Sequence, residues 1–230
     1  MARRRFFATR VAAGEAEIEG AGAAHLARVL RVAVGQEYEL AHAGQVYLGR
    51  VERVSPRAVG FRLLATLPAP APTPPLALAA ALFKFDRFEW MLEKATELGL
   101  SRLHLLATRR TDPRLVAAAA KRQERWQRLA LEAAQQSRRA DGPEIVPVQT
   151  LAEFLAAPPA GAKLLLSEEP GGAPVPIGAT SPLTLLSGPE GGFAPEEWAA
   201  AQAAGFAATS LGPRILRCET AILAALARLG

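Results

Sequence analysis

The sequence predicts an α/β protein in which a small, mainly β N-terminal domain precedes a larger domain with a mostly parallel sheet. Three observations support this prediction. Prolines crowd residues 68–75, strand-like runs dominate before them, and strand-like and helix-like runs alternate after them. Such alternation is typical of parallel α/β sheets, because each helix returns the chain to begin the next strand in the same direction. We therefore expect domains at residues 1–67 and 76–230, joined by a stiff extended linker at 68–75.

The elements of the first domain are short and mainly β. Residues Glu37–Leu40 and Val46–Val54 flank Ala41–Gly44 and indicate a hairpin. Apolar and other residues alternate over Val59–Leu63, which indicates a further strand. A short helix is expected at His25–Leu30.

The second domain alternates strands with helices. One helix is well specified, because Asp86 can cap it with Glu89 three residues later and Gly99 can end it. Its apolar residues recur on one face: Phe88, Met91, Leu92, Ala95 and Leu98. The expected strands are Leu76–Phe83, Arg102–Ala107, Ile145–Val148, Lys163–Leu166, Leu183–Leu186 and Ala207–Ser210.

Composition and charge limit the class of protein. Half of the residues are hydrophobic, but Pro, Gly or charged residues break every apolar run before it reaches membrane-spanning length. The single cysteine, Cys218, cannot form an internal disulfide or a thiolate metal cluster. Residues 1–67 carry ten Lys or Arg against six Asp or Glu, whereas the remaining 163 carry seventeen against sixteen. We expect a soluble cytoplasmic protein without bound metal or membrane association, whose basic N-terminal domain contacts a polyanion.

Two glycine-containing loops are the strongest functional signal. Ser187–Gly192 and Leu211–Thr220 each follow a strand-like run and lead into a helix-like run. Glycine permits positive φ and close approach of a ligand to the main chain, so the two loops together favour a pocket for a ligand such as an adenosyl cofactor. The first loop lacks the Gly-Lys-Ser/Thr ending of a P-loop and does not match the G-x-G-x-x-G pattern of a dinucleotide site. Taken singly, each loop has the alternative interpretation of an ordinary strand-to-helix connection.

Several separated motifs resemble those of one known family, the ribosomal RNA small-subunit methyltransferase E family of the SPOUT class. Its Glu-Gln-x-x-Arg segment is matched at Gln136 and Arg139, with Gln135 in place of the usual acid. The other matching segments are Arg5–Phe7, His25–Arg31, Lys84–Gly99, Ser187–Phe193 and Ser210–Ala221. They occur in the same order as in the family and cover both predicted domains.

The resemblance implies a fold, a reaction and partners. Family members have an N-terminal PUA-like β-barrel and a C-terminal α/β domain tied in a deep trefoil knot, and they form homodimers. They use S-adenosylmethionine to methylate N3 of a uridine in 16S ribosomal RNA, in the decoding region of the small subunit. We therefore expect an rRNA (uridine-N3-)-methyltransferase of ribosome biogenesis that acts on 16S rRNA or on the assembled small subunit.

Candidate site residues follow from the loops together with the resemblance. Glu190 and Glu219 are candidates for taking the N3 proton, and Arg217 or Arg214 for stabilising negative charge on the base. The alternatives are helix-dipole complementation for Glu219 and capping before Pro195 for Glu190. The cofactor is expected to contact Leu166, Leu186, Ser187, Gly188, Pro189, Gly191, Leu211, Gly212, Arg214, Ile215, Leu216 and Thr220. RNA is expected to contact Arg3, Arg4, Arg5, Arg28, Arg31, Lys84, Arg87, Gln136 and Arg139.

Two alternative functions remain open at this point. One is a non-catalytic RNA-binding or ribosome-assembly protein with a decayed cofactor pocket, against which the intact glycine loops argue. The other is a small-molecule enzyme with an accessory barrel, which leaves the N-terminal arginine surplus unexplained.

Overall fold

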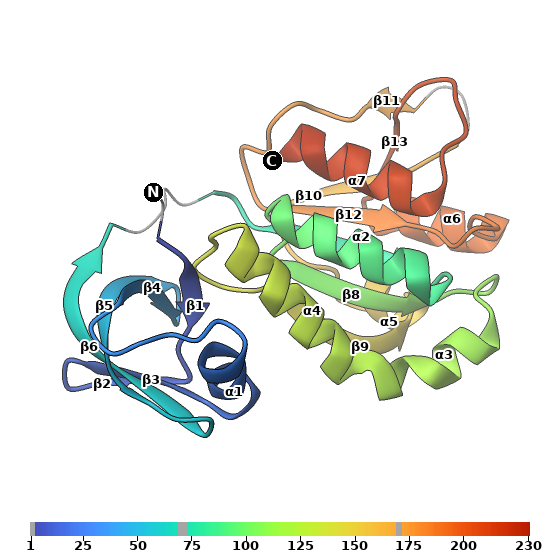
Figure 1. Ribbon diagram of the computed structural model, residues 1–230. Coiled ribbons are helices and arrows are strands. Elements are labelled where there is room, and N and C mark those ends of the chain that lie inside the picture. The colour runs from blue at the N-terminus through green and yellow to red at the C-terminus, as the bar shows by residue number, and fades with distance from the viewer. Residues whose placement is uncertain (1–2, 69–72, 169–171) are drawn as a thin grey trace. The chain divides into compact units, whose positions relative to one another are not determined.

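The computed structural model describes residues 3–68, 73–168 and 172–230. They form two compact units (Figure 1). The first contains residues 3–68 together with Ala134–Asp141, and the second contains residues 73–133 and the described residues from 142 onward. Each unit has its own sheet and its own buried core, which confirms the predicted α/β class. Residues 69–72 of the predicted linker lie outside the described residues.

A six-stranded sheet forms the first unit, with the strand order β1-β4-β5-β6-β3-β2. Strands β1 and β4 are parallel, and all other neighbours in this sheet are antiparallel. Its elements are β1 (Arg5–Phe7), β2 (Arg10–Ala12), β3 (Glu15–Glu19), α1 (Gly20–Arg28), β4 (Glu37–His42), β5 (Gln45–Val54) and β6 (Ala58–Leu67). The largest side chains of its core are Phe6, Ile18, Leu26, Leu40, Val51, Val59 and Phe61.

Two details of this unit differ from the sequence prediction. The β4–β5 turn contains only Ala43 and Gly44, because both have positive φ (49° and 77°) and so form a two-residue turn that matches strand twist. Helix α1 runs from Gly20 to Arg28 rather than over His25–Leu30. It ends early because Arg31 has a φ of 50°, which leaves the helical region.

A seven-stranded, wholly parallel sheet forms the second unit, with the order β11-β13-β10-β12-β7-β8-β9. All six predicted strands are confirmed, and β11 is additional. The strands are β7 (Leu76–Ala81), β8 (Arg102–Ala107), β9 (Glu144–Thr150), β10 (Ala162–Leu166), β11 (Ala173–Pro174), β12 (Leu183–Ser187) and β13 (Ala207–Ser210). The helices are α2 (Phe85–Glu97), α3 (Pro113–Ala119), η1 (Ala120–Arg122), α4 (Gln123–Gln136), α5 (Leu151–Ala156), α6 (Pro195–Ala203) and α7 (Cys218–Leu229).

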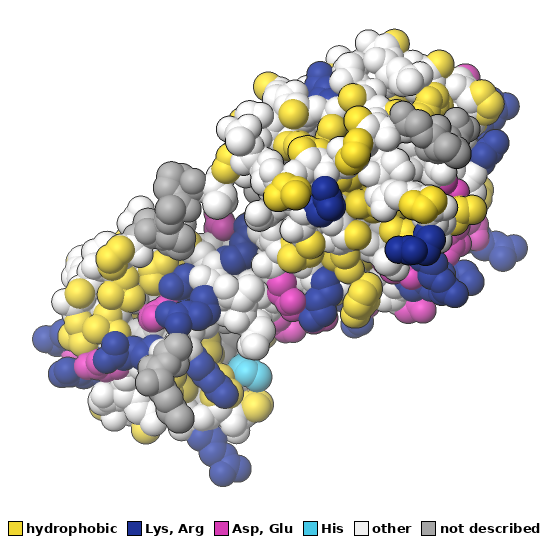
Figure 2. Space-filling view, turned by 90° about the horizontal axis from the view of Figure 1, so that it is seen from above, with side chains coloured by type: hydrophobic (Ala, Val, Ile, Leu, Met, Phe, Trp, Pro, Cys, Tyr) yellow, Lys and Arg dark blue, Asp and Glu magenta, His cyan; other side chains and the backbone are white. Residues whose placement is uncertain are grey.

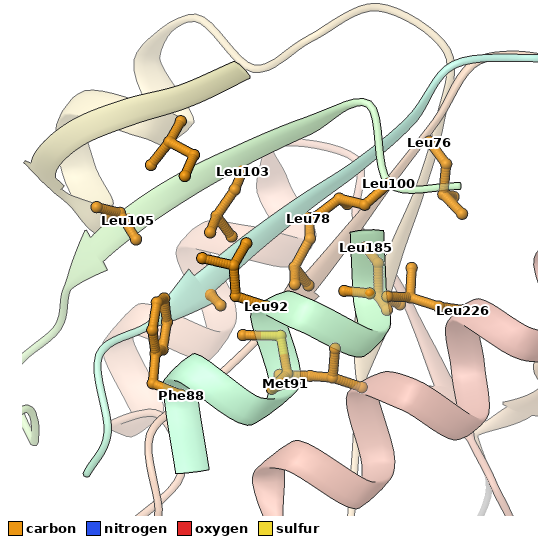
Figure 3. Packing of buried hydrophobic residues seen from close by; sticks show 14 of the residues in the cluster. Leu76, Leu78, Phe88, Met91, Leu92, Leu100, Leu103, Leu105, Leu185 and Leu226 are labelled. Carbon is orange, nitrogen blue, oxygen red and sulfur yellow. The ribbon is translucent and has the colours of Figure 1, made fainter. Parts of the chain in front are cut away.

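Helices cover both faces of this parallel sheet (Figure 1). Successive strand residues point to opposite faces, so Leu185 belongs to the core under α2 and α7, whereas Leu186 belongs to the core under α5 and α6. Figure 3 shows the first of these cores, where Met91 and Leu92 of α2 pack toward the sheet beside Leu226 of α7. Because helices cover both faces of the sheet, the loops lie at the ends of the strands.

Helix α2 begins two residues earlier than expected. Lys84 occupies the N-cap position without a side-chain cap, so the prediction that Asp86 caps this helix is wrong; Asp86 lies in the first turn. Its carboxylate is still favourable there, because the helix dipole is positive at that end. The predicted end is confirmed, since Gly99 has a φ of 95° directly after Leu98.

A buried histidine predicts acid-sensitive stability. The ring of His104 on β8 packs against Phe154, Gln149 Nε2 lies 3.1 Å from Nδ1, and Nε2 is buried without a described partner. Burial, assisted by Arg102 and opposed by Glu144, lowers the pKa of His104 in the folded state. The unfolded chain therefore takes up this proton first, and the free energy of unfolding should fall as pH drops below about 6.5.

We expect His104→Phe to remove this acid-dependent loss, which amounts to at most about 1.4 kcal/mol at about pH 5.5. Urea unfolding at about pH 7.5 and pH 5.5 measures it. The matched control is His25→Gln, which alters an exposed histidine of α1. An unchanged acid-dependent loss in His104→Phe would contradict the assignment to this residue.

Candidate active site

The two glycine-containing loops meet because of the order of the strands. The first loop, residues 187–194, joins β12 to α6, and the second, residues 211–217, joins β13 to α7. Strands β12 and β13 lie on either side of β10 and all three are parallel, so their carboxyl ends share one edge of the sheet. Ligands of open α/β sheets bind at this edge. The loops are therefore neighbours although their sequences are separated by helix α6.

One cavity of about 270 Å³ lies between the loops. Its volume is near the lower end of the range of roughly 300–1,000 Å³ that is typical of ligand pockets. It brings together nine of the twelve predicted cofactor residues: Leu166, Ser187, Gly188, Pro189, Gly191, Leu211, Gly212, Arg214 and Leu216. The other three do not line it, because Leu186 is buried in the core under α5 and α6, Ile215 is 80 % exposed, and Thr220 is exposed on α7.

Glycines allow the main chain to form the cavity wall. A Cβ at Gly188 would lie 3.1 Å from two ring carbons of Phe193, which is closer than ordinary packing allows. Gly192 has a φ of 69° and donates its backbone N–H to the Pro189 carbonyl at 2.8 Å, which closes a turn. Gly212 has a φ of 112° and open space where a side chain would be, so backbone conformation alone selects glycine there.

Several residues of the cavity were not among the twelve predicted cofactor contacts. They are Arg110, Ser167, Glu168, Gly192, Phe193, Trp198, Cys218 and Ala221. Arg110 follows the end of β8, and Ser167 and Glu168 directly follow β10. The rule that parallel strands end at one edge could have found these three, whereas no local motif marks them.

The two predicted acids lie beside the cavity and share one arginine. Arg87 of α2 places Nη1 3.2 Å from Glu190 Oε1 and Nε 3.8 Å from Glu219 Oε1. Glu219 is buried in the first turn of α7, whereas Glu190 is about half exposed. Arg217 is exposed at the N-cap of α7. The arrangement joins the first loop, the start of α7 and α2 through a single guanidinium.

The thiol of Cys218 is predicted to be unreactive. Burial, with the negative charges of Glu190, Glu219 and Glu168, raises its pKa to about 11. Because the thiolate is the reactive form, alkylation by iodoacetamide at about pH 7.5 should be far slower in the folded chain than in urea. This cysteine is the only one in the chain, so total alkylation measures it directly. Equal rates in the folded and unfolded chain would contradict the raised pKa.

The predicted RNA contacts fall into two groups. Arg3 pairs with Glu37 at 3.0 Å, and Arg5 pairs with Glu39 at 2.8 Å with only 9 % of its side chain exposed. Arg139 pairs with Asp141 at 3.3 Å and Arg87 with the acids described above. The exposed members, for which the described residues contain no acidic partner, are Arg4, Arg28, Arg31 and Lys84, together with exposed Gln136. Figure 2 shows Lys and Arg side chains at the surface on the face that it views, with Asp and Glu beside several of them.

Residues 134–141 pack with the first unit rather than with the parallel sheet. Glu39 is buried, and both Arg5 and Arg138 bond to its carboxylate. Burial alone would raise the pKa of Glu39, but the hydrogen bonds from the two arginines outweigh it and lower the pKa. Arg5 also donates to the backbone carbonyl of Arg138. The charge of Arg5 is thus used inside the first unit.

Comparison with known proteins shows which class this fold and cavity define. A family model described as an RNA methyltransferase domain matches residues 69–230, which include the parallel sheet and both loops. Within the described part of the chain, no helix is long and apolar enough to cross a membrane, and no three His, Cys, Asp or Glu side chains gather as a metal site requires. Residues 69–230 therefore form an RNA methyltransferase domain.

More specific likenesses are found over the whole chain. It is 36% identical over 226 residues to the ribosomal RNA small subunit methyltransferase E of Mycobacterium tuberculosis, covering 94% of this chain and 86% of that protein. The corresponding protein of Synechocystis is 35% identical, with 89% and 69% covered. The chain belongs to the ribosomal RNA small subunit methyltransferase E family, which confirms the resemblance found in the sequence.

Solved structures connect this fold to a cofactor. A ribosomal RNA small subunit methyltransferase E from Neisseria gonorrhoeae, bound to S-adenosyl methionine, matches with a TM-score of 0.87 at 28% identity over 98% of this chain and 96% of that chain. A methyltransferase from Legionella pneumophila with bound SAM matches with a TM-score of 0.86 at 28% identity, with the same coverage. The cavity between the glycine loops fits such a cofactor, because its walls combine bare main chain with apolar and charged side chains.

Proposed function

We propose that this chain transfers the methyl group of S-adenosylmethionine to N3 of a uridine in 16S ribosomal RNA. The observation that carries the proposal is the single cavity lined by both glycine loops at the carboxyl edge of the parallel sheet. Membership of the ribosomal RNA small subunit methyltransferase E family supports the choice of substrate. The substrate is 16S rRNA or the assembled small subunit in the cytoplasm.

The chain's residues have separate tasks in this reaction. When bound, S-adenosylmethionine supplies a methyl group already activated on a sulfonium. The main chain at Gly188 and Gly212 holds the adenosine, and the walls of the cavity keep water from it. Glu219 or Glu190 takes the N3 proton, and Arg217 stabilises the negative charge left on the base. Most of the catalytic effect comes from alignment of the two reactants.

The proposal extends to the architecture. The first unit is a PUA-like barrel that binds RNA, and the second is a SPOUT domain with a deep trefoil knot. Two chains associate as a homodimer, so that the surface of one chain can present RNA to the other. The six-stranded sheet of the first unit and the membership of the family support this extension.

RNA binding by the first unit gives a salt-dependent prediction. Arg28 and Arg31 are exposed, so their joint replacement by Ala should weaken rRNA binding and reduce the slope of log affinity against log salt by about 1.4 to 1.8. Cofactor affinity should not change. Filter binding over a salt series measures the slope. The control is Arg10→Ala, whose charge is already paired with Glu17 at 2.9 Å; an equal loss there would point to net charge alone.

Mapping of modified nucleosides tests the function directly. Ribosomal RNA from a strain lacking this gene should lack one methyluridine, which mass spectrometry can locate. Purified chain with S-adenosylmethionine should restore N3-methyluridine at that position. A deletion strain with every methyluridine present would contradict the proposal.

A further inference from the structure

Arg110 is an arginine of the cavity for which the reaction above has no use. It lies in the segment between β8 and α3, and its side chain lines the same cavity as both glycine loops. Only two other charged side chains line this cavity among the described residues, Glu168 and Arg214. The cavity thus presents charges of both signs within walls that are otherwise formed by glycine, apolar and small side chains.

The guanidinium of Arg110 is exposed, forms no ion pair within the described residues, and is anchored to the first loop by one hydrogen bond. Its Nη1 donates to the Gly191 carbonyl at 2.7 Å, and its Cδ would lie 3.6 Å from a Cβ at Gly191, so the stem follows the first loop. A guanidinium has five N–H donors, of which this contact uses one. No acidic side chain of the described residues lies within ion-pair distance of it, although the charge of Arg110 contributes to lowering the pKa of Glu196. The neighbouring Arg109 differs, because it pairs with Glu196 and its backbone N–H donates to Glu197 at 2.7 Å.

A cation that lines a cavity and has no ion-pair partner among the described residues is suited to an anionic group of the ligand. The amino-acid end of S-adenosylmethionine carries a carboxylate and an ammonium, whereas its adenosine carries no charge. A guanidinium can bind a carboxylate with two parallel hydrogen bonds. Arg214 also lines the cavity but has no hydrogen bond within the described chain, so ordering it would cost more side-chain entropy.

We propose that Arg110 binds the carboxylate of the cofactor's amino-acid end, while Glu168 faces its ammonium. This assignment rests on the proposed function and adds the residue that orients the methyl donor along the cavity. The apolar and glycine walls are then left for the adenosine. Because Arg110 also donates to the Gly191 carbonyl, the position of the first loop fixes where Arg110 holds the carboxylate.

Two ligands distinguish whether Arg110 binds the carboxylate or only supports the first loop. S-adenosylhomocysteine has the amino-acid end, and 5′-methylthioadenosine lacks it. Calorimetric titration of the full-length chain should show that Arg110→Gln weakens S-adenosylhomocysteine about 10- to 100-fold, with less than about a twofold effect on 5′-methylthioadenosine. Arg110→Lys should give an intermediate loss, because it keeps the charge but not the planar fork. The matched control, Arg109→Gln, should bind both ligands as the unaltered chain does.

Other results would overturn the proposal in distinct ways. Equal weakening of both ligands would show that Arg110 only supports the first loop. Unchanged affinity for both, with weaker rRNA binding, would assign Arg110 to an RNA phosphate. Failure of the unaltered chain to bind S-adenosylhomocysteine or S-adenosylmethionine would refute the proposed function itself.

Discussion

Gly188→Val should weaken S-adenosylmethionine binding by about 5- to 150-fold while both units stay folded. A Cβ at this position would already lie 3.1 Å from the ring of Phe193, and the two further methyl groups of Val enlarge the clash. Either the ring or the loop must move, and both line the cavity. Such overpacking typically costs about 1–3 kcal/mol, and in this case it falls on a wall that the cofactor touches. Calorimetric titration measures the affinity, and thermal unfolding shows whether the fold remains.

The neighbouring Gly191 supplies the matched control for this prediction. A Cβ there would lie 3.6 Å from Arg110 Cδ, which is ordinary packing, and the residue does not have positive φ. Gly191→Ala should therefore change the affinity by less than about threefold. If Gly188→Val bound the cofactor as well as Gly191→Ala did, the first loop would not form part of the cofactor site.

Arg87→Ala should lower the rate of methyl transfer by about 100-fold and change cofactor affinity much less. Its guanidinium lies 3.2 Å from Glu190 and 3.8 Å from Glu219. Removal leaves buried Glu219 without an ion-pair partner among the described residues and frees both acids from their positions. General acid–base groups typically contribute about 10²- to 10⁴-fold, and that contribution depends on position. Single-turnover transfer of labelled methyl groups to rRNA at saturating RNA measures the rate.

Rescue and control variants separate positioning from other roles of Arg87. Arg87→Lys should recover part of the rate, because one charge can still serve one of the two acids. Arg125→Ala breaks another ion pair of α2, in which Arg125 of α4 lies 2.7 Å from Glu89 of α2, and should leave the rate unchanged. If Arg87→Ala weakened rRNA binding but kept the full rate at saturating RNA, the residue would contact RNA instead.

The sequence predicted the parallel sheet and the two loops because their signals are local. Glycine after an apolar run marks a strand end, and each of the six predicted strands of the second unit is present. No local sequence signal identifies residues such as Arg110 and Glu168. They lie at the cavity because the strands that precede them, β8 and β10, end at the same edge of the sheet as β12 and β13. Leu186 was predicted to contact the cofactor but does not line the cavity, because the alternation of side chains along β12 points it into the core under α5 and α6.

Charge pairing in the first unit was also beyond the sequence prediction. The prediction did not include β1, so it could not place Arg5 beside Glu39 across the parallel β1–β4 pair. The packing of residues 134–141 with this unit joins Arg138 to the same carboxylate from 99 positions away in the chain. Contacts of this kind follow from the tertiary fold, whereas a count of arginines describes only the total charge.

A crystal structure of this chain with S-adenosylmethionine is the most direct measurement. It should show adenosine between Gly188 and Gly212 and the carboxylate of the amino-acid end at Arg110. The alternative is a second cavity of about 290 Å³ that shares Leu211 and Gly212 but is otherwise lined by Gly172, Pro174, Val175, Ser210 and Arg228. Cofactor density in that cavity, with the space between the two loops empty, would contradict the account.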